Sequence, residues 1–600
     1  MNKIWIFITV LGVVFFTGCK KDFLDKTPDE DLTIGDVFTN FRYAESFLTS
    51  AYSNLPNEIN LSDDPGMNPF VAATDEMDIG YSYPFSHQMT SGAWGPSNIP
   101  IDIWGNMYRG IRKTNLFLEN VDNVPLSAAF SNEERDVWKG EAFFLRAFYH
   151  FMLMRVFGPI PISRHSYVIE TDFKALRRQP MDECVDFVVK QCDTALNFLP
   201  KKVIGNGDYG RATQAAALAL KARVLLYAAS PLWNGNLDYA NFKDNEGVNL
   251  FSTSYDPGKW KKASDASKAC IDQTTAAGYQ IYGQNNTDPV LTRQNLFLDN
   301  NNTEIFFAKN DGLSRLIEAA SATPRFGDQF ALAGYSPTQE IVDAYEMKDG
   351  KLPILGYNDD HSPKINSESD YKESGYASSV DPEGHYPAGV SNMYVGREPR
   401  FYADINFSGA IRNGIQFDFT YSGADGHQKN KDGYTKTGYL IKKFVDQSFD
   451  LSNMGNPGVR KTWVYFRLGE QYLNYAEALN EYNPGDPEIP RYVNLIRKRA
   501  GLPDIPSGLS QPEMRQRIRH ERRIELAFET HRYFDLRRWK LAGDIDNQPV
   551  YGMNTEGDGD SYYQRTEIEK RIFSSPKHYL WPILQSEINQ NHNLVQNPGW

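Results

Sequence analysis

Cysteine is scarce in this chain, which has four cysteines in 600 residues: Cys19, Cys184, Cys192 and Cys270. A disulfide-stabilised protein uses more cysteines at closer spacing. Cys184 and Cys192 fall in one helical pattern, where their separation is about 12 Å, too far for a disulfide bond. We therefore expect Cys184, Cys192 and Cys270 to be small buried hydrophobic residues.

An excess of positive charge and long apolar runs are also lacking. The net charge is -13, and such a chain repels the phosphates of nucleic acids unless it carries a local basic patch. An apolar run covers residues 4–16, which is shorter than the roughly 20 residues of a membrane-spanning helix. The sequence therefore favours neither a nucleic-acid-binding protein nor an integral membrane protein.

Signatures of common enzymes are missing as well. The chain has no G-x-S-x-G motif, no Walker loop and no Cys-x-x-Cys motif. Gly205, Gly207 and Gly210 fit a dinucleotide-binding G-x-G-x-x-G pattern, but that motif follows a buried strand, and here a helical pattern precedes it. We expect a turn into a helix instead, with Thr213 as its N-cap residue.

Charged side chains are dense between residues 515 and 531. His520 begins a pattern like that of zinc proteases, but residue 524, where the second histidine would stand, is isoleucine. Three glutamates share one helical face among several arginines: Glu521, Glu525 and Glu529 among Arg515, Arg517, Arg519, Arg522 and Arg523. We expect an ion-pair network that fixes this helix against its neighbours.

Asp75, Glu76 and Asp78 form a second acidic cluster. A glycoside hydrolase needs two carboxyl groups at a defined separation across the sugar, and adjacent residues of a chain point apart. We therefore predict no catalytic residue, no metal ligand and no cofactor, and a protein that is not an enzyme.

The N-terminus has the features of a lipoprotein signal peptide. Lys3 supplies positive charge, the apolar run 4–16 follows, and small residues lead to Gly18 and Cys19. This junction resembles the lipobox of bacterial lipoproteins, which implies cleavage before Cys19 and lipidation of its thiol. Lipid chains tether a protein to a membrane without spanning it. We assign residues 1–18 to the signal peptide and 19–35 to a lipidated flexible tether.

Helical periodicity dominates the remaining chain on either side of a loop-rich segment. It predicts helices at 41–54, 104–121, 133–157, 181–199, 212–229, 259–275, 465–482, 490–500 and 511–529. The helices combine small and aromatic residues in the manner of tetratricopeptide units. Residues 278–461 lose this periodicity, and short runs at 304–308 and 438–444 read as strands. We predict a mainly α fold with an N-terminal helical scaffold at 36–277, a loop-rich lobe at 278–461 and C-terminal helices at 462–600.

The order of several motifs resembles that of the SusD/RagB family of outer-membrane nutrient-binding lipoproteins, over nearly the whole chain. The matching stretches are Phe23-Leu-Asp25, Ala73-Thr-Asp-Glu76, Tyr108-Arg-Gly-Ile111, Gly140-Glu-Ala-Phe-Phe-Leu-Arg-Ala147, Phe157-Gly-Pro-Ile-Pro161, Arg211-Ala-Thr213, Ala219-Leu-Lys-Ala-Arg223, Pro337-Thr-Gln-Glu340, Arg397-Glu-Pro-Arg400, Tyr472-Leu-Asn-Tyr-Ala-Glu477, Arg519-His-Glu521, His531-Arg-Tyr-Phe534 and Asn597-Pro-Gly-Trp600. No single motif is specific to the family, and the resemblance rests on the order in which the motifs follow one another along the chain.

The resemblance implies a tetratricopeptide-like scaffold and a loop-rich lobe that carries the ligand site. It implies binding of a glycan without catalysis, an anchor in the outer membrane, and a lid-like partnership with a SusC-like TonB-dependent transporter. The ligand-binding aromatic residues of the family lie in loops. Candidate binding residues here are Tyr81, Tyr83, Trp94, Asn98, Arg325, Phe326 and Tyr335.

Three other functions fit parts of the sequence. A surface glycoside hydrolase would show turnover of an oligosaccharide or a convergent pair of carboxyl groups. A protein that only interacts with other outer-membrane proteins would lack an exposed aromatic cleft. A peptide in place of the glycan is the third alternative, because the scaffold motifs do not specify the ligand.

Overall fold

The computed structural model describes residues 33–56, 58, 69–80, 85–99, 101–167, 176–203, 205, 208–285, 287–299, 302–327 and 331–600, with only the backbone described at 311–314. The predicted signal peptide, Cys19, Tyr81 and Tyr83 lie outside these residues. Among the helices of the described part, none has both the length and the apolar character needed to cross a membrane.

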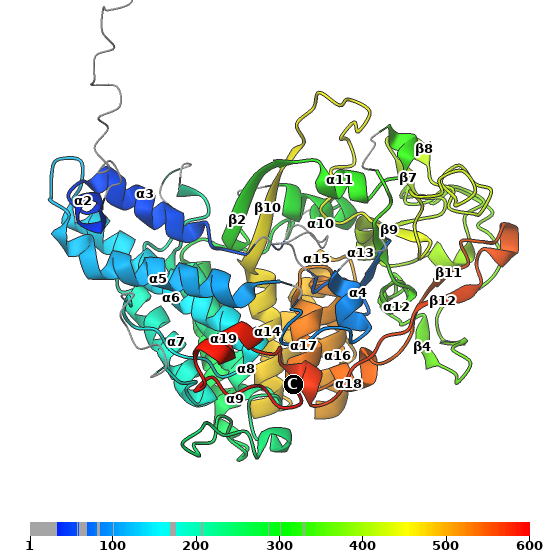
Figure 1. The fold of residues 1–600 in the computed structure, drawn as a ribbon. Coiled ribbons are helices and arrows are strands. Elements are labelled where there is room, and N and C mark those ends of the chain that lie inside the picture. Colours follow the sequence, from blue (N-terminus) through cyan, green and yellow to red (C-terminus); the bar gives the residue numbers. More distant parts are fainter. Residues whose placement is uncertain are drawn as a thin grey trace, which may run out of the picture.

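Helices make up most of the fold, which confirms the predicted mainly α class. The scaffold consists of α2 (Ile34–Val37), α3 (Phe41–Tyr52), α5 (Ile103–Asn120), α6 (Asn132–Phe157), α7 (Met181–Leu196), α8 (Gln214–Ala229), α9 (Gly258–Ala276), α14 (Leu468–Tyr482), α15 (Glu488–Arg499), α16 (Gln511–Glu525) and α17 (His531–Arg538). Successive helices pack on one another from α3 to α9, and α14 then packs on α9 (Figure 1). This succession of antiparallel neighbours is typical of stacked helical hairpins.

Local sequence explains where the best-predicted helices begin and end. The side chain of Thr213 accepts a hydrogen bond from the backbone of Ala216 and caps α8, as predicted. Ser131 caps α6 in the same way, and α6 ends at Gly158, whose φ of 73° favours glycine. The three described cysteines are free and buried, which confirms their predicted role.

Two predicted helices miss a change of backbone conformation at one end. The helix predicted from residue 465 begins at Leu468, because Val459–Arg467 forms strand β10, which pairs antiparallel with β2 (Ile305–Ser314). The helix predicted to residue 529 ends at Glu525, since Phe528 and Thr530 take positive φ angles of 63° and 67°. A helix cannot continue through that backbone conformation.

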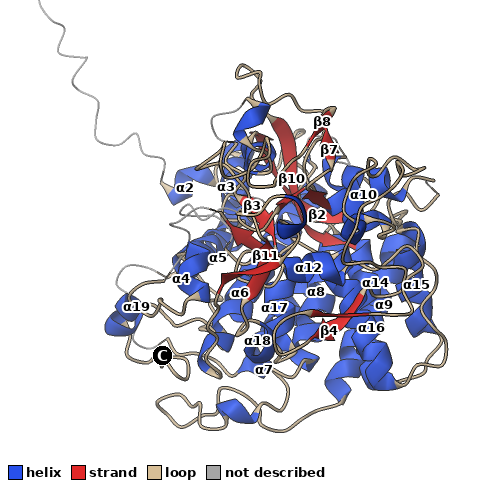
Figure 2. Ribbon diagram, turned by 90° about the vertical axis from the view of Figure 1, so that its right-hand side faces the viewer, coloured by secondary structure: helices blue, strands red, loops and turns tan. Residues whose placement is uncertain are grey.

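The loop-rich lobe is built from short helices and two-stranded sheets. The smaller helices of the chain are α4 (Phe85–Thr90), α10 (Pro289–Leu298), α11 (Leu316–Ala320), α12 (Gln339–Ala344), α13 (Pro399–Asp404), α18 (Ala542–Ile545) and α19 (Gln585–Gln590). The remaining strand pairs are β1 (Met77–Ile79) with β3 (Tyr335–Pro337), β4 (Ile354–Tyr357) with β5 (Pro363–Ile365), β6 (Ile405–Phe407) with β9 (Tyr439–Ile441), β7 (Ile411–Arg412) with β8 (Ile415–Gln416), and β11 (Val550–Met553) with β12 (Arg565–Glu569). Figure 2 shows these strands among the helices. The predicted domain boundaries stay a prediction.

One core joins the lobe to the scaffold. The ring of Phe148 in α6 lies 5.8 Å from that of Phe307 in β2 and 5.2 Å from that of Tyr465 in β10. The same buried cluster extends to Trp581 near the C-terminus. Burial of this apolar surface is the main contribution to the stability of the fold.

Buried ion pairs fix α16, as predicted, but most partners come from other elements. Arg467, at the end of β10, donates to Glu304, Glu525 and Glu529 at 2.7–2.9 Å. Glu521 accepts from Arg497 of α15 at 3.0 Å. The predicted arginines of α16 itself pair elsewhere: Arg515 with Glu481, Arg522 with Asp535 and Arg523 with Asp75.

Candidate binding cavity

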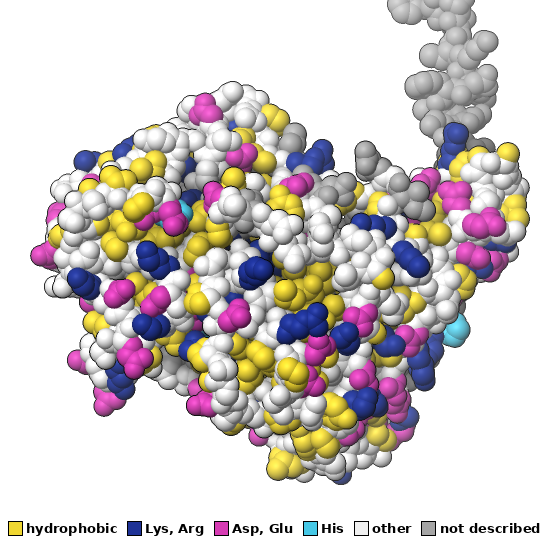
Figure 3. Space-filling model, turned by 180° about the vertical axis from the view of Figure 1, so that it is seen from behind, with side chains coloured by type: hydrophobic (Ala, Val, Ile, Leu, Met, Phe, Trp, Pro, Cys, Tyr) yellow, Lys and Arg dark blue, Asp and Glu magenta, His cyan; other side chains and the backbone are white. Residues whose placement is uncertain are grey.

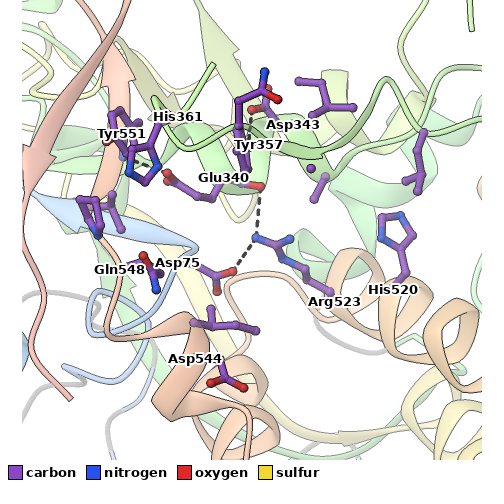
Figure 4. A pocket seen from close by; sticks show the side chains of 18 of the residues that line it. Asp75, Glu340, Asp343, Tyr357, His361, His520, Arg523, Asp544, Gln548 and Tyr551 are labelled. Carbon is purple, nitrogen blue, oxygen red and sulfur yellow. Dashed lines mark hydrogen bonds and ion pairs between the residues drawn. The ribbon is translucent and has the colours of Figure 1, made fainter. Parts of the chain in front are cut away.

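An open cavity of about 740 Å³ lies where α12, α16 and α18 meet the β4–β5 hairpin and β11. Figure 4 shows the cavity and labels Asp75, Glu340, Asp343, Tyr357, His361, His520, Arg523, Asp544, Gln548 and Tyr551. The described residues that line the cavity are Asp75, Glu340, Asp343, Ala344, Leu352, Ile354, Gly356, Tyr357, Asn358, Asp359, His361, His520, Arg523, Arg532, Asp544, Ile545, Gln548, Pro549, Val550 and Tyr551. These residues come from segments that lie far apart in the sequence and meet only in the folded chain.

Aromatic rings form one wall of the cavity. The rings of His361 and Tyr551 lie 4.9 Å apart with an angle of 32° between their planes. His361 sits in the turn between β4 and β5 with a φ of 60°. Tyr357, on the same hairpin, is 37% exposed, and its hydroxyl donates to Asp343 at 2.6 Å. The wall offers a partly exposed aromatic surface to a ligand.

Arginine–aspartate pairs form the base of the cavity. Arg532 donates to both carboxylate oxygens of Asp75 at 2.7 Å, and Arg523 donates to one of them at 2.7 Å. Burial alone would raise the pKa of Asp75, but Arg523 and Arg532 outweigh it and hold this pKa well below its usual range. Asp343 accepts from Arg565 at 3.1 Å. The carboxylates at the base are therefore held by cations in the protein.

Glu340 and His520 carry polar atoms without a hydrogen-bond partner among the described residues. Glu340 accepts from the backbone of Tyr551 at 3.0 Å through one oxygen, and its other oxygen is unpartnered. Burial raises the pKa of Glu340 to about 8, so the carboxyl group is mostly protonated at neutral pH. The Nε2 atom of His520 has no hydrogen bond either, and it lies 3.7 Å from a carboxylate oxygen of Glu346. Burial, and then the positive charge of Arg523, lowers the pKa of His520 well below the usual value.

These unpartnered atoms bear on ligand binding. A buried polar group without a partner costs about 1–3 kcal/mol, and such groups in native proteins call for an explanation. Figure 4 places Glu340 beside Tyr551 and His361, with His520 across the cavity. Both are buried side-chain atoms without a hydrogen bond among the described residues. They are polar groups of the lining that the protein itself leaves without a hydrogen bond.

The carboxyl groups of the cavity suit binding better than glycoside hydrolysis. Hydrolysis needs a protonated acid together with a second, ionised carboxylate that acts as nucleophile or base. Glu340 fits the first role. Asp75 and Asp343 are already bound by arginines, so neither is free to act as nucleophile or base.

Asp78, His87 and Glu569 lie close enough together to suggest a metal site. Both ring nitrogens of His87 already face acceptors, with Nδ1 3.0 Å from Glu569 and Nε2 3.1 Å from the carbonyl of Ile79. Burial lowers the pKa of His87, but its bonds to Glu569 and the charge of Asp78 outweigh this and raise it to about 9. The three side chains therefore hold one another through an ion pair and hydrogen bonds in this structure.

Three of the aromatic residues predicted to bind ligand are buried, although stacking on a sugar needs an exposed ring. Trp94 is 7% exposed, and its ring packs 4.6 Å from Trp600 and 5.1 Å from Trp581. Phe326 is 8% exposed, and Tyr335 is fully buried in β3. The prediction that Trp94, Phe326 and Tyr335 offer exposed rings to a ligand is therefore corrected: all three are buried. Packing against distant parts of the chain covers these rings.

Asn98 and Arg325 are exposed, as a binding role requires. Asn98 lies in a tight turn with Gly95 and lines a separate cavity of about 520 Å³ beside α19. Arg325 forms an ion pair with Asp425. Neither lines the larger cavity. Sequence reasoning missed Tyr357, His361 and Tyr551, and only the turn-forming Asn358-Asp359-Asp360 run pointed to the hairpin.

Comparisons with known proteins identify two family models along the chain. The model of the SusD family matches residues 292–600. A model described as starch-binding and associating with the outer membrane matches residues 22–226. SusD-like protein P2 of Formosa agariphila is 24% identical over 477 residues, which cover 77% of this chain and 73% of the relative.

Solved structures share the fold over nearly the whole chain. The structure of BT4246 has a TM-score of 0.81 and 26% identity, and the match covers 94% of this chain and 100% of the other. A SusD-like protein of Bacteroides fragilis, BF3747, has a TM-score of 0.73 and 23% identity, with coverage of 94% and 98%. A laminarin-binding SusD-like protein has a TM-score of 0.57 and 20% identity, with coverage of 94% and 100%.

Proposed function

The chain belongs to the SusD family, and on this basis we propose that it binds an oligosaccharide and delivers it to a SusC-like TonB-dependent transporter. One of its two family models describes starch binding and association with the outer membrane. Side chains of both signs are interspersed over the back of the molecule (Figure 3). Such a mixed face differs from the basic stripe that binds nucleic acids.

The aromatic wall of the cavity is the observation that carries the proposal. The apolar face of a sugar stacks on an aromatic ring, while its hydroxyl groups bond to polar side chains around the ring. His361 and Tyr551 supply such rings, and the exposed amides of Asn358 and Gln548 lie in the same lining. A volume of about 740 Å³ falls within the range of small-ligand pockets.

Calorimetry with oligosaccharides tests the site. Laminari-oligosaccharides are the first ligand to try, because a structural neighbour binds laminarin. A printed array of glycans extends the search. Loss of one stacked ring in Tyr551→Ala should weaken binding by about 1 kcal/mol, or about fivefold. Tyr43→Ala, at a tyrosine of α3 that is 46% exposed, is the matched control and should bind normally. Unchanged affinity in Tyr551→Ala would exclude the cavity as the binding site.

Binding without cleavage is part of the proposal. Asp75 and Asp343 are held by arginines, and the two lining carboxylates without an ion pair among the described residues, Asp359 and Asp544, are exposed rather than at the base of the cavity. Chromatography of the glycan after long incubation tests this. Shortened products that disappear in Glu340→Gln would instead support the hydrolase alternative. A peptide ligand is favoured if peptides bind and no glycan of the array does.

Candidate residues outside the cavity extend the proposed binding surface. Tyr81, Tyr83, Asn98 and Arg325 stay proposed ligand contacts. The packed rings of Trp94, Phe326 and Tyr335 favour a structural role. Asn98→Ala and Arg325→Ala variants should lose affinity for longer glycans more than for short ones. Equal affinity at every length would remove both residues from the binding surface.

We further propose that lipidated Cys19 anchors the protein to the outer membrane, with the folded part at the cell surface. Cys19→Ala should move the protein from the membrane fraction to a soluble form, and continued membrane retention would contradict the anchor. A permanent complex buries more than about 2,000 Å², so the transporter should copurify in mild detergent. Repeated isolation of the protein alone, while the transporter is expressed, would contradict the partnership.

A further inference from the structure

We propose that the cavity selects sugars without acidic groups, either neutral or amino-bearing, and disfavours uronates and sulfated sugars. This inference rests on the proposed function, because it names the class of sugar that the same cavity accepts. It follows from the charges and hydrogen-bonding groups that the lining presents.

The two arginines of the lining are already paired with a carboxylate. Arg523 and Arg532 both donate to Asp75 at 2.7 Å. Recognition of a carboxylate or sulfate depends on charge-assisted bonds from cations that are not already paired. An acidic sugar would have to displace Asp75 from both arginines and leave that carboxylate buried and uncompensated, which is strongly unfavourable.

Acidic groups outnumber basic ones around the cavity. The lining holds four aspartates, Asp75, Asp343, Asp359 and Asp544, and two arginines. Asp359 and Asp544 are exposed at the rim, and neither has an ion pair with another described residue. The negative potential of these two carboxylates repels an acidic ligand and attracts an amino group.

The uncharged polar groups match hydroxyl groups. A sugar hydroxyl both donates and accepts, and so do a protonated carboxyl group, a neutral imidazole and an amide side chain. Glu340 and His520 supply the first two with atoms that have no hydrogen bond among the described residues, and Asn358 and Gln548 supply amides. The ring of His361 lies against that of Tyr551 at an angle of 32° and contributes to the aromatic wall. The cavity thus provides neutral donors and acceptors where an anion would need free cations.

A glycan array that contains neutral, amino-bearing, uronate and sulfated oligosaccharides tests the inference, followed by calorimetry at about pH 7.5, where an ordinary imidazole is mostly neutral. Neutral or amino-bearing glycans should bind best, and uronates of matched length about tenfold more weakly or worse. The double variant Asp359→Asn/Asp544→Asn should reduce the difference in affinity between neutral glycans and uronates. The control Asp265→Asn/Asp272→Asn, on the exposed face of α9, should preserve it.

The outcomes separate this inference from the proposed function. If acidic glycans bind as tightly as neutral ones through Tyr551, the inference is overturned and the proposed function stands. A preference for neutral sugars that the double variant leaves unchanged would also overturn it, since the rim charges would not be its cause. If no glycan binds, or if Tyr551→Ala binds every glycan normally, the proposed function fails at this cavity and the inference fails with it.

Discussion

The two sides of helix α16 use charge in different ways. On one side, Glu521 and Glu525 are buried among arginines from other elements, and Glu525 lies 2.7 Å from Arg467. On the other side, His520 and Arg523 face the cavity. The Nε2 atom of His520 has no hydrogen bond and lies 3.7 Å from a carboxylate oxygen of Glu346, and the Nε atom of Arg523 has no hydrogen bond among the described residues. Several arginines surround the buried glutamates where α16 joins the scaffold, whereas the cavity side leaves a ring nitrogen and a guanidinium nitrogen without a hydrogen bond.

Removal of Arg467 should have the largest effect on stability. Its guanidinium group binds Glu304, Glu525 and Glu529, so Arg467→Ala leaves each of these three buried carboxylates with one cation fewer. Loss of one partner of a buried ion pair costs about 3–5 kcal/mol. Urea unfolding should show this loss, while glycan affinity per folded molecule stays normal.

Two further variants keep this prediction decisive. Arg467→Lys keeps the positive charge but lacks the planar guanidinium group that reaches several carboxylates. Its unfolding free energy should therefore lie below that of wild type and above that of Arg467→Ala, and it can be measured even if Arg467→Ala does not fold. Arg460→Ala, at an exposed residue of the same strand, should change stability little. Equal losses at Arg460 and Arg467 would show that the ion pairs do not hold α16 in place.

Stability should depend on pH with opposite signs for Glu340, on the cavity side of α16, and for Glu529, in the ion-pair network on the other side. Burial raises the pKa of Glu340 to about 8. Its contribution is therefore fully present below the unfolded pKa of about 4.5 and is lost as the pH rises towards 8. Burial also favours protonation of Glu529, but Arg467 and Lys443 outweigh it and hold the pKa at about 2. The contribution of Glu529 is present above about pH 4.5 and is lost as the pH falls towards 2.

Glu340→Gln isolates the cavity side. The unfolding free energy of wild type should fall as the pH rises from 5 to 8, because Glu340 then ionises on unfolding. Glutamine does not ionise, so the fall in the variant should be smaller by about 1–3 kcal/mol. Glu76, whose pKa burial also raises to about 8, is unchanged by the substitution and cancels in the comparison. Parallel stability curves for the two proteins would mean that Glu340 is already ionised in the folded state.

The sequence contains most of the information on the scaffold, because helices depend on local pattern. The ends of α6 and the cap of α8 follow from nearby residues such as Ser131, Gly158 and Thr213. Only the last three residues of strand β10, 465–467, fall in a predicted helix, and their strand conformation depends on pairing with β2, far away in the sequence. The acidic residues of the network were predicted, but partners such as Arg467 and Arg499 come from other elements.

The cavity could be predicted only in part. Asp75 and His520 drew attention as residues with possible chemistry, and both line it. Tyr551 and His361 form its wall only because the β4–β5 hairpin and β11 meet in the fold. Trp94 looked like an exposed loop aromatic, but Trp600, at the opposite end of the chain, packs on it. Exposure of a loop ring depends on such long-range packing, which one sequence does not reveal.

His520→Leu should separate binding from stability on the cavity side. Leucine is apolar and similar in size, and it removes a buried nitrogen that has no hydrogen-bond partner. Unfolding free energy should therefore stay within about 1 kcal/mol of wild type or rise. Glycan affinity should fall about fivefold, because one polar contact is lost. His165→Leu, at a side chain that is 79% exposed, should leave both quantities unchanged. A large loss of stability in His520→Leu would place His520 with the paired side of α16.

The smallest effect on unfolding free energy is expected for a solvent-exposed ion pair that is as short as the buried pairs of Arg467. Lys268 and Asp272, one turn apart on α9, lie 2.7 Å from each other, the distance that separates Arg467 from Glu525. Their side chains are 33% and 56% exposed. Water and salt screen such a pair, and holding two long side chains costs entropy. Lys268→Ala should therefore change the unfolding free energy by about 0.3–0.5 kcal/mol or less. This small difference should vanish in about 1 M salt, where the screening length falls to about 3 Å. A loss comparable with that of Arg467→Ala would mean that ion-pair distance rather than burial decides stability in this fold, and the contrast between the two sides of α16 would lose its physical basis.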